Sequence, residues 1–220
     1  GDHPYARARA TISGRRDVTT TGRTSKPSAW LLGVIFGLGA CLAAGVAPAR
    51  AADEKPKVEM ETSAGKIVLE LEPEKAPLTV ENFLKYVDEG FYDDLIFHRV
   101  IRDFMIQGGG FDDKLREKSK GTRGPVKNES RGGLPNKRGT IAMARTPNPD
   151  SATNQFFINH KDNPFLDFTG GNGGYTVFGT VIEGMDVVDA IAATQTSSRG
   201  GMADVPVKPI YIKSVKRVKK

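Results

Sequence analysis

The sequence YDDLIFHRVIRDFMIQGGG, residues 92–110, is the stretch from which the fold can be worked out. Apolar runs on both sides of a polar Arg-Asp pair predict two short strands, at 95–101 and 104–107. Side chains alternate between the faces of a strand, so we expect His98 and Arg99 to point to opposite faces, with His98 structural. The glycines that follow allow a ligand or another strand to approach the backbone. An apolar surface with a few fixed hydrogen-bond donors is therefore expected, as in many binding sites.

The rest of the chain adds further strands and two helices. Apolar and polar residues alternate through 58–62 and 67–71 around a Ser-Ala-Gly turn, which predicts a hairpin. Apolar residues recur at helical spacing within 77–90, and a second, shorter helix is expected after Gly184. Residues 111–139 have few apolar anchors and predict a long surface loop. The remaining strands are expected at 140–144, 155–159, 175–181 and 210–218.

These elements have no regular alternation of strand and helix. Two helices are too few to cover both faces of a parallel sheet. We therefore predict a mainly β fold, a closed antiparallel barrel of about eight strands capped by two α-helices.

The N-terminal residues 1–51 are expected to be an extension and secretory signal peptide outside the fold. The segment 29–46 is almost wholly apolar, follows basic residues and precedes a small-residue cleavage site at Ala51. We expect a charged linker at 52–57 and one domain at 58–220, exported to the periplasm without stable membrane insertion.

Two alternatives to cleavage at this site remain open. The apolar segment 29–46 is at the short edge of the length that spans a bilayer, so it could stay as an anchor. The sequence LGAC ending at Cys41 is similar to a bacterial lipoprotein site, at which the cysteine would be acylated. The apolar run continues past Cys41, which favours a signal peptide cleaved after Ala51.

The charge outside residues 1–51 is nearly balanced. That segment holds seven of the 32 Lys and Arg residues and two of the 26 Asp and Glu residues, which leaves 25 basic and 24 acidic residues and a net charge of +1. We therefore expect no nucleic acid partner, and we expect a monomer. Cys41 is the only cysteine, so a mature chain would have neither a disulfide nor thiol chemistry.

Few residues of the domain could carry covalent or metal chemistry. His98 and His160 are its only histidines, so a zinc site is not expected. Motifs of serine hydrolases, dinucleotide-binding loops, P-loops and calcium loops are missing from the sequence, and we expect no cofactor. The candidate site is a set of donors beside apolar side chains: Arg99, Gln107 and Gln155 with Phe104, Met105, Phe157, Phe165 and Leu166.

Residues 92–109 resemble the signature of the cyclophilin family of peptidyl-prolyl cis-trans isomerases. The matching residues are Tyr92, Leu95, Phe97-His98-Arg99, Phe104-Met105 and Gln107-Gly108-Gly109. The similarity covers about residues 57–218, with further matching segments at 139–144, 151–158, 165–167 and 177–179. The leader and the short loops are most similar to bacterial periplasmic members.

The resemblance implies the same capped barrel and an isomerase that acts on proline-containing polypeptides without a cofactor. It implies that Arg99 is the catalytic arginine, with Phe104 and Gln107 in the catalytic set. For substrate binding it implies seven further residues: Met105, Ala144, Gln155, Phe157, Phe165, Leu166 and Tyr175. A non-enzymatic peptide-binding chaperone on the same barrel is the alternative function.

This sequence departs from many eukaryotic members at four positions near the implied site. Phe165 stands where they have Trp, and Tyr175 stands where they have His. Arg145 and Thr146 replace an Asn-Ala pair. The resemblance implies that the change at Phe165 weakens cyclosporin binding more than catalysis.

Overall fold

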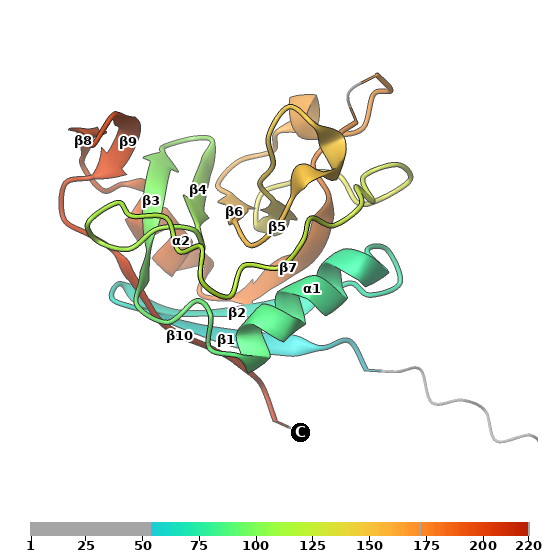
Figure 1. Ribbon diagram of the computed structural model, residues 1–220, viewed down its shortest axis with the longest axis horizontal. Helices are drawn as coiled ribbons and strands as arrows, with labels where there is room; N and C mark the ends of the chain where they lie inside the picture. The colour runs from blue at the N-terminus through green and yellow to red at the C-terminus, as the bar shows by residue number, and fades with distance from the viewer. Residues whose placement is uncertain (1–53, 172, 220) are drawn as a thin grey trace, which may run out of the picture. The chain divides into compact units, whose positions relative to one another are not determined.

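Eight strands form a closed barrel in the computed structural model of this protein, which describes residues 54–171 and 173–219 (Figure 1). The strands are β1 (Lys57–Thr62), β2 (Gly65–Leu71), β3 (Leu95–Ile101), β4 (Met105–Gly108), β5 (Thr140–Met143), β6 (Phe156–Asn159), β7 (Val177–Glu183) and β10 (Tyr211–Arg217). Their order around the barrel is β1-β10-β3-β4-β6-β5-β7-β2, and neighbouring strands are antiparallel. The predicted barrel is confirmed, whereas the predicted signal peptide and Cys41 lie outside the described residues.

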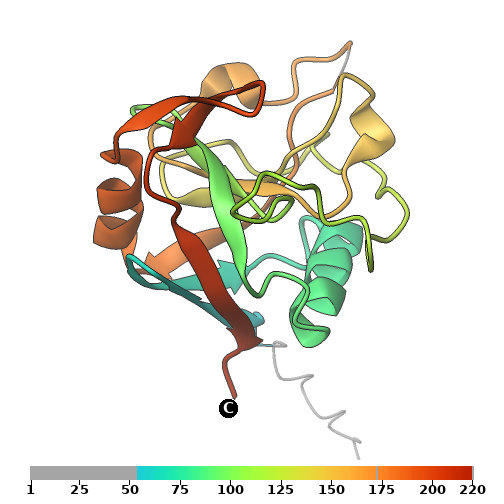
Figure 2. The same ribbon diagram turned by 60° about the vertical axis from the view of Figure 1, so that its left-hand side comes forward.

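Two α-helices lie on opposite sides of the barrel, α1 (Pro77–Asp88) and α2 (Met185–Ala192) (Figure 2). Helix α1 begins with a proline, whose fixed φ suits the first helical position. The N–H groups of Leu78 and Thr79 donate to the Glu129 carboxylate at 3.0 and 2.9 Å, which satisfies two free donors of the first turn. Both predicted helices are present, and no helix in the described parts of the chain is long and apolar enough to cross a bilayer.

Large apolar side chains fill the barrel and meet the inner face of α1. Phe83 of α1 lies edge-on to Phe156 at 6.0 Å between ring centroids, and against Phe178 at 5.1 Å. All three rings are fully buried. Helix α1 is therefore held by a hydrophobic contact, which is the main source of helix stability in a folded domain.

Residues 111–139 contain no helix or strand, as the sequence predicts. Isolated bridges join this long loop to the segment before β6, from Val126 to Ala152, and to strand β7, from Leu134 to Val177. The loop is thus held close to the strands that carry the candidate site.

A hairpin outside the barrel is missing from the sequence-based prediction. It consists of β8 (Thr196–Arg199) and β9 (Met202–Pro206), which form a separate two-stranded sheet. Strand β8 has the sequence Thr-Ser-Ser-Arg and is largely exposed, so it lacks the alternation of apolar and polar residues that predicts a strand. Gly200 and Gly201 have φ of 59° and 79°, and two successive positive φ values suit a tight hairpin turn.

A β-bulge in β3 contradicts the expectation that His98 and Arg99 point to opposite faces. The register with β4 shifts between Phe97 and Arg99. Phe97 and Val100 both belong to the barrel core, so two residues separate them where strict alternation allows one. His98 and Arg99 therefore both point away from the barrel interior. The bulge changes the direction of the Arg99 side chain from the one that regular alternation predicts.

Candidate active site

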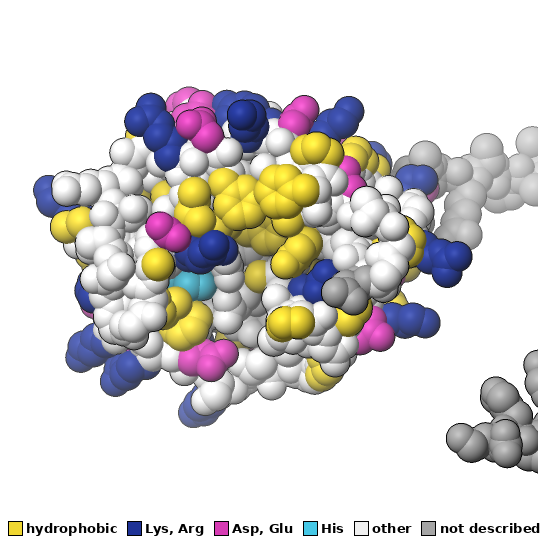
Figure 3. Space-filling view, turned by 90° about the horizontal axis from the view of Figure 1, so that it is seen from above, with side chains coloured by type: hydrophobic (Ala, Val, Ile, Leu, Met, Phe, Trp, Pro, Cys, Tyr) yellow, Lys and Arg dark blue, Asp and Glu magenta, His cyan; other side chains and the backbone are white. Residues whose placement is uncertain are grey.

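A second apolar cluster lies outside the barrel core, on the outer side of β4, β5 and β6. It is distinct from the core, and we call it the outer apolar cluster. Its members are the buried Met105, Ala142, Phe157, Leu166 and Val177, with Ile101, Phe104, Leu134, Ala144 and Tyr175 partly buried around them. Figure 3 shows hydrophobic side chains gathered into a continuous area on one face, with basic side chains at its border.

Six residues that the sequence places in the site meet in this cluster: Phe104, Met105, Ala144, Phe157, Leu166 and Tyr175. They come from five separate parts of the chain. Strand β6 pairs with β4 so that Phe157 stands opposite Gln107, and alternation along β6 sends Phe156 inward and Phe157 outward. The register of these strands thus assembles the cluster.

Aromatic rings shape the cluster and its edge. Phe157 and Tyr175 meet edge to face, with ring centroids 5.6 Å apart. Phe104 and Phe165 are stacked at the same distance. Phe165 is 69% exposed, so its outer face is open to a ligand. It lies in the short 3₁₀ turn η2 (Pro164–Leu166), whose Leu166 is buried in the cluster.

The three predicted polar residues lie in a row beside the cluster. Arg99 on β3 stands opposite Gln107 on β4. The Gln107 amide Nε2 donates to the Gln155 amide oxygen at 3.1 Å. The Ala144 N–H donates to the Gln155 carbonyl at 3.0 Å, which joins this row to β5. A charged donor and two amides thus border an apolar surface.

His98, the neighbour of Arg99, is buried and neutral near pH 7. Burial lowers its pKa to about 4, and the positive charge of Arg99 acts in the same direction. Its ring lies 4.6 Å from that of Phe111. Its Nδ1 has no hydrogen-bond partner among the described residues. His98 therefore adds no second positive charge beside Arg99.

A buried asparagine network supports both ends of the outer apolar cluster. The Asn163 amide donates to the Phe104 carbonyl at 3.0 Å and to the Asn159 amide oxygen at 2.8 Å. The Asn136 N–H donates to the Asp167 carboxylate at 2.6 Å. These bonds link the turn before β4 to the turn η2 that carries Phe165 and Leu166. Sequence reasoning missed these asparagines, although their repeated occurrence beside predicted strands was a usable signal.

Arg145 holds one wall of the cluster. Its guanidinium lies 4.5 Å from the centre of the Tyr175 ring. It also donates to the carbonyls of Gly173 and Gly174, at 3.1 and 3.2 Å. The arginine thus fixes the Tyr175 ring and the glycine-rich segment before it.

A polar cavity of about 220 Å³ adjoins the outer apolar cluster. It shares Gln107, Ala144 and Gln155 with the predicted site, and Glu117 of the long loop lines it. An apolar surface next to a polar cavity suits an extended peptide, of which one side chain is apolar and the adjacent backbone is polar. Glu117 was not singled out from the sequence.

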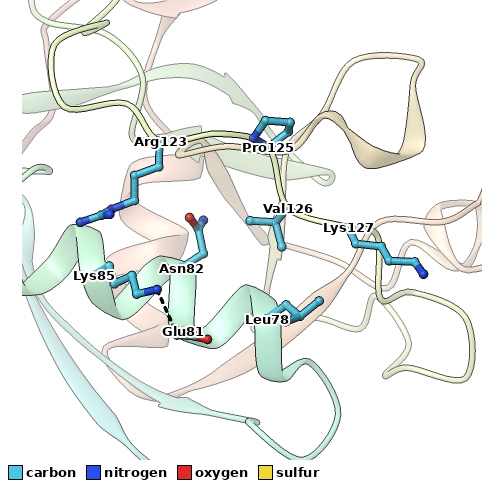
Figure 4. A pocket seen from close by; sticks show the side chains of 8 residues that line it. All are labelled: Leu78, Glu81, Asn82, Lys85, Arg123, Pro125, Val126 and Lys127. Carbon is cyan, nitrogen blue, oxygen red and sulfur yellow. Dashed lines mark ion pairs between the residues drawn. The ribbon is translucent and has the colours of Figure 1, made fainter.

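A larger cavity, of about 360 Å³, lies between α1 and the long loop (Figure 4). Leu78, Asn82 and Val126 line it, and Lys85 makes an ion pair with Glu81 at 2.6 Å on its rim. None of the predicted site residues lines this cavity. Within residues 54–171 and 173–219, no group of three or more His, Cys, Asp and Glu side chains could hold a metal ion.

Comparison with known proteins shows which family the chain is similar to. Residues 57–217 match the family model described as cyclophilin type peptidyl-prolyl cis-trans isomerase/CLD. The chain is 59% identical over 162 residues to peptidyl-prolyl cis-trans isomerase cyp18 of Streptomyces antibioticus, covering 72% of this chain and 96% of that protein. It is 53% identical over 173 residues to peptidyl-prolyl cis-trans isomerase A of Dickeya dadantii, covering 79% and 90%. It is 52% identical over 161 residues to peptidyl-prolyl cis-trans isomerase B of Escherichia coli, covering 72% and 97%.

Solved structures show the same architecture. A Cryptosporidium parvum cyclophilin type peptidyl-prolyl cis-trans isomerase, crystallised in the presence of the dipeptide Ala-Pro, superposes with a TM-score of 0.63 at 27% identity. The match covers 74% of this chain and 99% of that one.

Proposed function

The chain belongs to the cyclophilin family of peptidyl-prolyl cis-trans isomerases and acts on proline-containing peptides, and we propose that Arg99 and the outer apolar cluster form its catalytic site. The observation that carries this proposal is the pairing of Arg99 with Gln107 at the border of the cluster. A permanent positive charge thus lies next to a surface that fits a prolyl ring.

The physical problem is to lower the barrier to rotation about the X-Pro bond. That barrier is about 20 kcal/mol, because rotation breaks the conjugation between the amide nitrogen and the carbonyl. No covalent bond is made or broken. The site needs only to bind the twisted amide more tightly than either planar form. A million-fold acceleration corresponds to roughly 8 kcal/mol of such differential stabilisation.

Arg99 is suited to provide this stabilisation. The twisted amide nitrogen gains a lone pair, which accepts a hydrogen bond that the planar amide does not accept. A guanidinium donates several N–H groups and stays charged at any physiological pH. Because it borders an apolar surface, a bound peptide would exclude water and strengthen the hydrogen bond.

The remaining predicted residues would bind and orient the peptide. We propose that Phe104, Met105, Phe157, Leu166 and Tyr175 enclose the prolyl ring. Gln107 and Gln155, with Ala144 beside them, would hold the peptide backbone at the edge of the polar cavity. The exposed ring of Phe165 would contact a neighbouring residue of the peptide. Rotation then takes place about a bond whose two sides are held separately.

Exchange of Arg99 tests the catalytic role. We expect Arg99→Ala to lose at least about a hundredfold in kcat/KM on an X-Pro peptide, because one charge-assisted donor to the transition state is removed. Arg217→Ala is the matched control, since Arg217 is 47% exposed and ion-paired with Asp88 on another side of the barrel. Both variants should unfold near the wild-type temperature. Full activity of Arg99→Ala would contradict the proposal.

We further propose that residues 1–51 direct the protein to the periplasm, where it assists the folding of secreted proteins. The apolar segment 29–46 and the small residues before Ala52 support this proposal. Mass spectrometry of protein recovered from cells tests it. An N-terminus at Ala52 supports cleavage, whereas an acylated Cys41 supports a lipoprotein.

A second candidate role, binding of unfolded chains without catalysis, is favoured by the exposure of Phe165. A refolding assay on a client that needs no proline isomerisation separates the two roles. If Arg99→Ala protects such a client as well as the wild type, binding is independent of catalysis. The nearly balanced charge of residues 52–220 supports the proposal of a monomer that does not bind nucleic acid.

A further inference from the structure

We propose that Asp204 is a positioning residue for Arg99. Asp204 lies on the β8–β9 hairpin, which was not predicted from the sequence. Its carboxylate Oδ2 lies 3.9 Å from Arg99 Nε. Within the described parts of the chain, no other carboxylate lies within 4.0 Å of this guanidinium. The inference rests on the catalytic role proposed for Arg99.

The hairpin covers the side of β3 that carries the arginine. Strand β10 pairs with β3 only at Leu95 and Ile96, so the second half of β3 has no ladder partner on that side. Strand β9 packs there instead. Arg99 lies in this second half, next to the bulge. The bulge and the hairpin therefore act together on the direction of one side chain.

The hairpin is firmly attached, so it can hold a charge in place. The Arg199 guanidinium donates to the Asp113 carbonyl. The Tyr211 hydroxyl donates to the Asp113 carboxylate at 3.1 Å. Val205, the neighbour of Asp204, is 1% exposed. The register of the hairpin shifts between the pairs Ser197–Val205 and Arg199–Met202, so Asp204 lies in an irregular part of β9, from which its carboxylate reaches Arg99.

The backbone of Asp204 adds a second observation. Its φ is 60°, in the left-handed region that side chains other than Asn and Asp rarely adopt. Such conformations persist where the surrounding structure enforces them. In this protein the residue with the left-handed backbone conformation, Asp204, is also the one whose carboxylate lies beside Arg99.

The contact engages the Nε side of the guanidinium. At 3.9 Å it is an attraction between charges and not a hydrogen bond. A planar guanidinium attracted at Nε leaves its two Nη groups available to the peptide. The two side chains are 41% and 40% exposed, so the pair contributes little to stability. Its effect should therefore show in turnover and not in unfolding.

Replacement of Asp204 by Asn and by Gly tests the proposal. Both residues tolerate a positive φ, and both remove the charge. We expect kcat/KM to fall about three- to tenfold in both variants through kcat, because a misplaced catalytic group costs up to about a hundredfold. The unfolding temperature should not change. Glu59→Gln is the matched control, since Glu59 is 46% exposed and lies 3.4 Å from Lys66 on β2.

The same substitution in the Arg99→Ala background separates positioning from a structural effect. If Asp204 acts through Arg99, Asp204→Asn should not lower the residual activity of Arg99→Ala further. Wild-type activity should also fall with added salt more steeply than that of Asp204→Asn, because salt screens the pair.

Three results would overturn the proposal. They are unchanged or raised kcat/KM in Asp204→Asn, an equal loss in both backgrounds, and a loss that Glu59→Gln reproduces. If Arg99→Ala is inactive while Asp204→Asn is normal, only the role of Asp204 fails. If Arg99→Ala is fully active, the catalytic role of Arg99 fails as well.

Discussion

At the scale of the residue, the neighbours His98 and Arg99 in β3 show how the environment of a basic side chain decides its role. The Arg99 side chain is 41% exposed, whereas His98 is 2% exposed and burial lowers its pKa to about 4. Both leave the barrel interior because of the bulge between Phe97 and Arg99. The site thus receives one positive charge from two basic residues.

The lowered pKa of His98 predicts a dependence of stability on pH. The unfolded chain takes up a proton near pH 6.5, whereas the folded chain does so only near pH 4. Between these values the unfolded state binds more protons, so the free energy of unfolding should rise with pH. The full effect is at most about 3 kcal/mol and is complete above pH 6.5.

Denaturant titrations of the wild type and His98→Gln between pH 4.5 and 7 measure this dependence. The variant cannot titrate at this position, so its stability should vary less across the window. The pKa values of Asp88, Asp112 and Asp189 are lowered from the usual 3.8, so these carboxyl groups change stability only below pH 4.5. Equal slopes for the two proteins would contradict the role of His98.

At the scale of the element, short connections place the site as much as the strands do. The 3₁₀ turn η2 and the turn before β4 carry Phe165 and Phe104, whose rings stack. Both turns are fastened by the Asn163 amide. Loss of this amide should therefore loosen the rim of the outer apolar cluster and leave the barrel closed.

We expect Asn163→Ala to lower the free energy of unfolding by about 2 kcal/mol, since it removes two hydrogen bonds and leaves the buried Asn159 amide oxygen without its Asn163 donor, whereas the Phe104 carbonyl keeps the His160 N–H. The KM for an X-Pro peptide should rise as the rim loosens. Denaturant unfolding and peptide kinetics measure the two effects. The exposed Asn148, which accepts a 3.1 Å bond from the Asp150 N–H, provides the control, and Asn148→Ala should cost about 1 kcal/mol or less. A normal KM in Asn163→Ala would contradict the link to the site.

At the scale of the whole molecule, closure of the barrel joins the two ends of the domain. Strand β1 lies between β2 and β10, so the first strand depends on the last. Strand β10 also pairs with the start of β3, which leads to Arg99. The site is therefore coupled to the C-terminal strand.

We expect residues 52–220 alone to fold and to have full isomerase activity, since the family match spans 57–217. Residues 52–210 should fail to fold, because β1 and β3 both lose a partner. Circular dichroism and peptide kinetics of the two proteins check this. The longer protein should also lack tryptophan fluorescence, since Trp30 is the only tryptophan in the chain. An active 52–210 protein would show that closure is dispensable.

Sequence alone determined the eight barrel strands, the two helices and the set of residues that could form an apolar site with fixed donors. These features are local, because a period of two or 3.6 residues records which side of an element is buried. The sequence also placed Phe156 and Phe157 on opposite faces of their strand, which the structure confirms.

Only the tertiary structure decided where Arg99 points and what lies beside it. The bulge at His98 arises from the register between β3 and β4, which no local period records. Strand β8 is polar and largely exposed, so it leaves no apolar pattern in the sequence, and the hairpin that it forms with β9 brings Asp204 to an arginine 105 positions earlier in the chain. Alternation specifies a face of one strand, whereas the direction of a catalytic side chain depends on contacts between distant segments, which form only when the barrel closes.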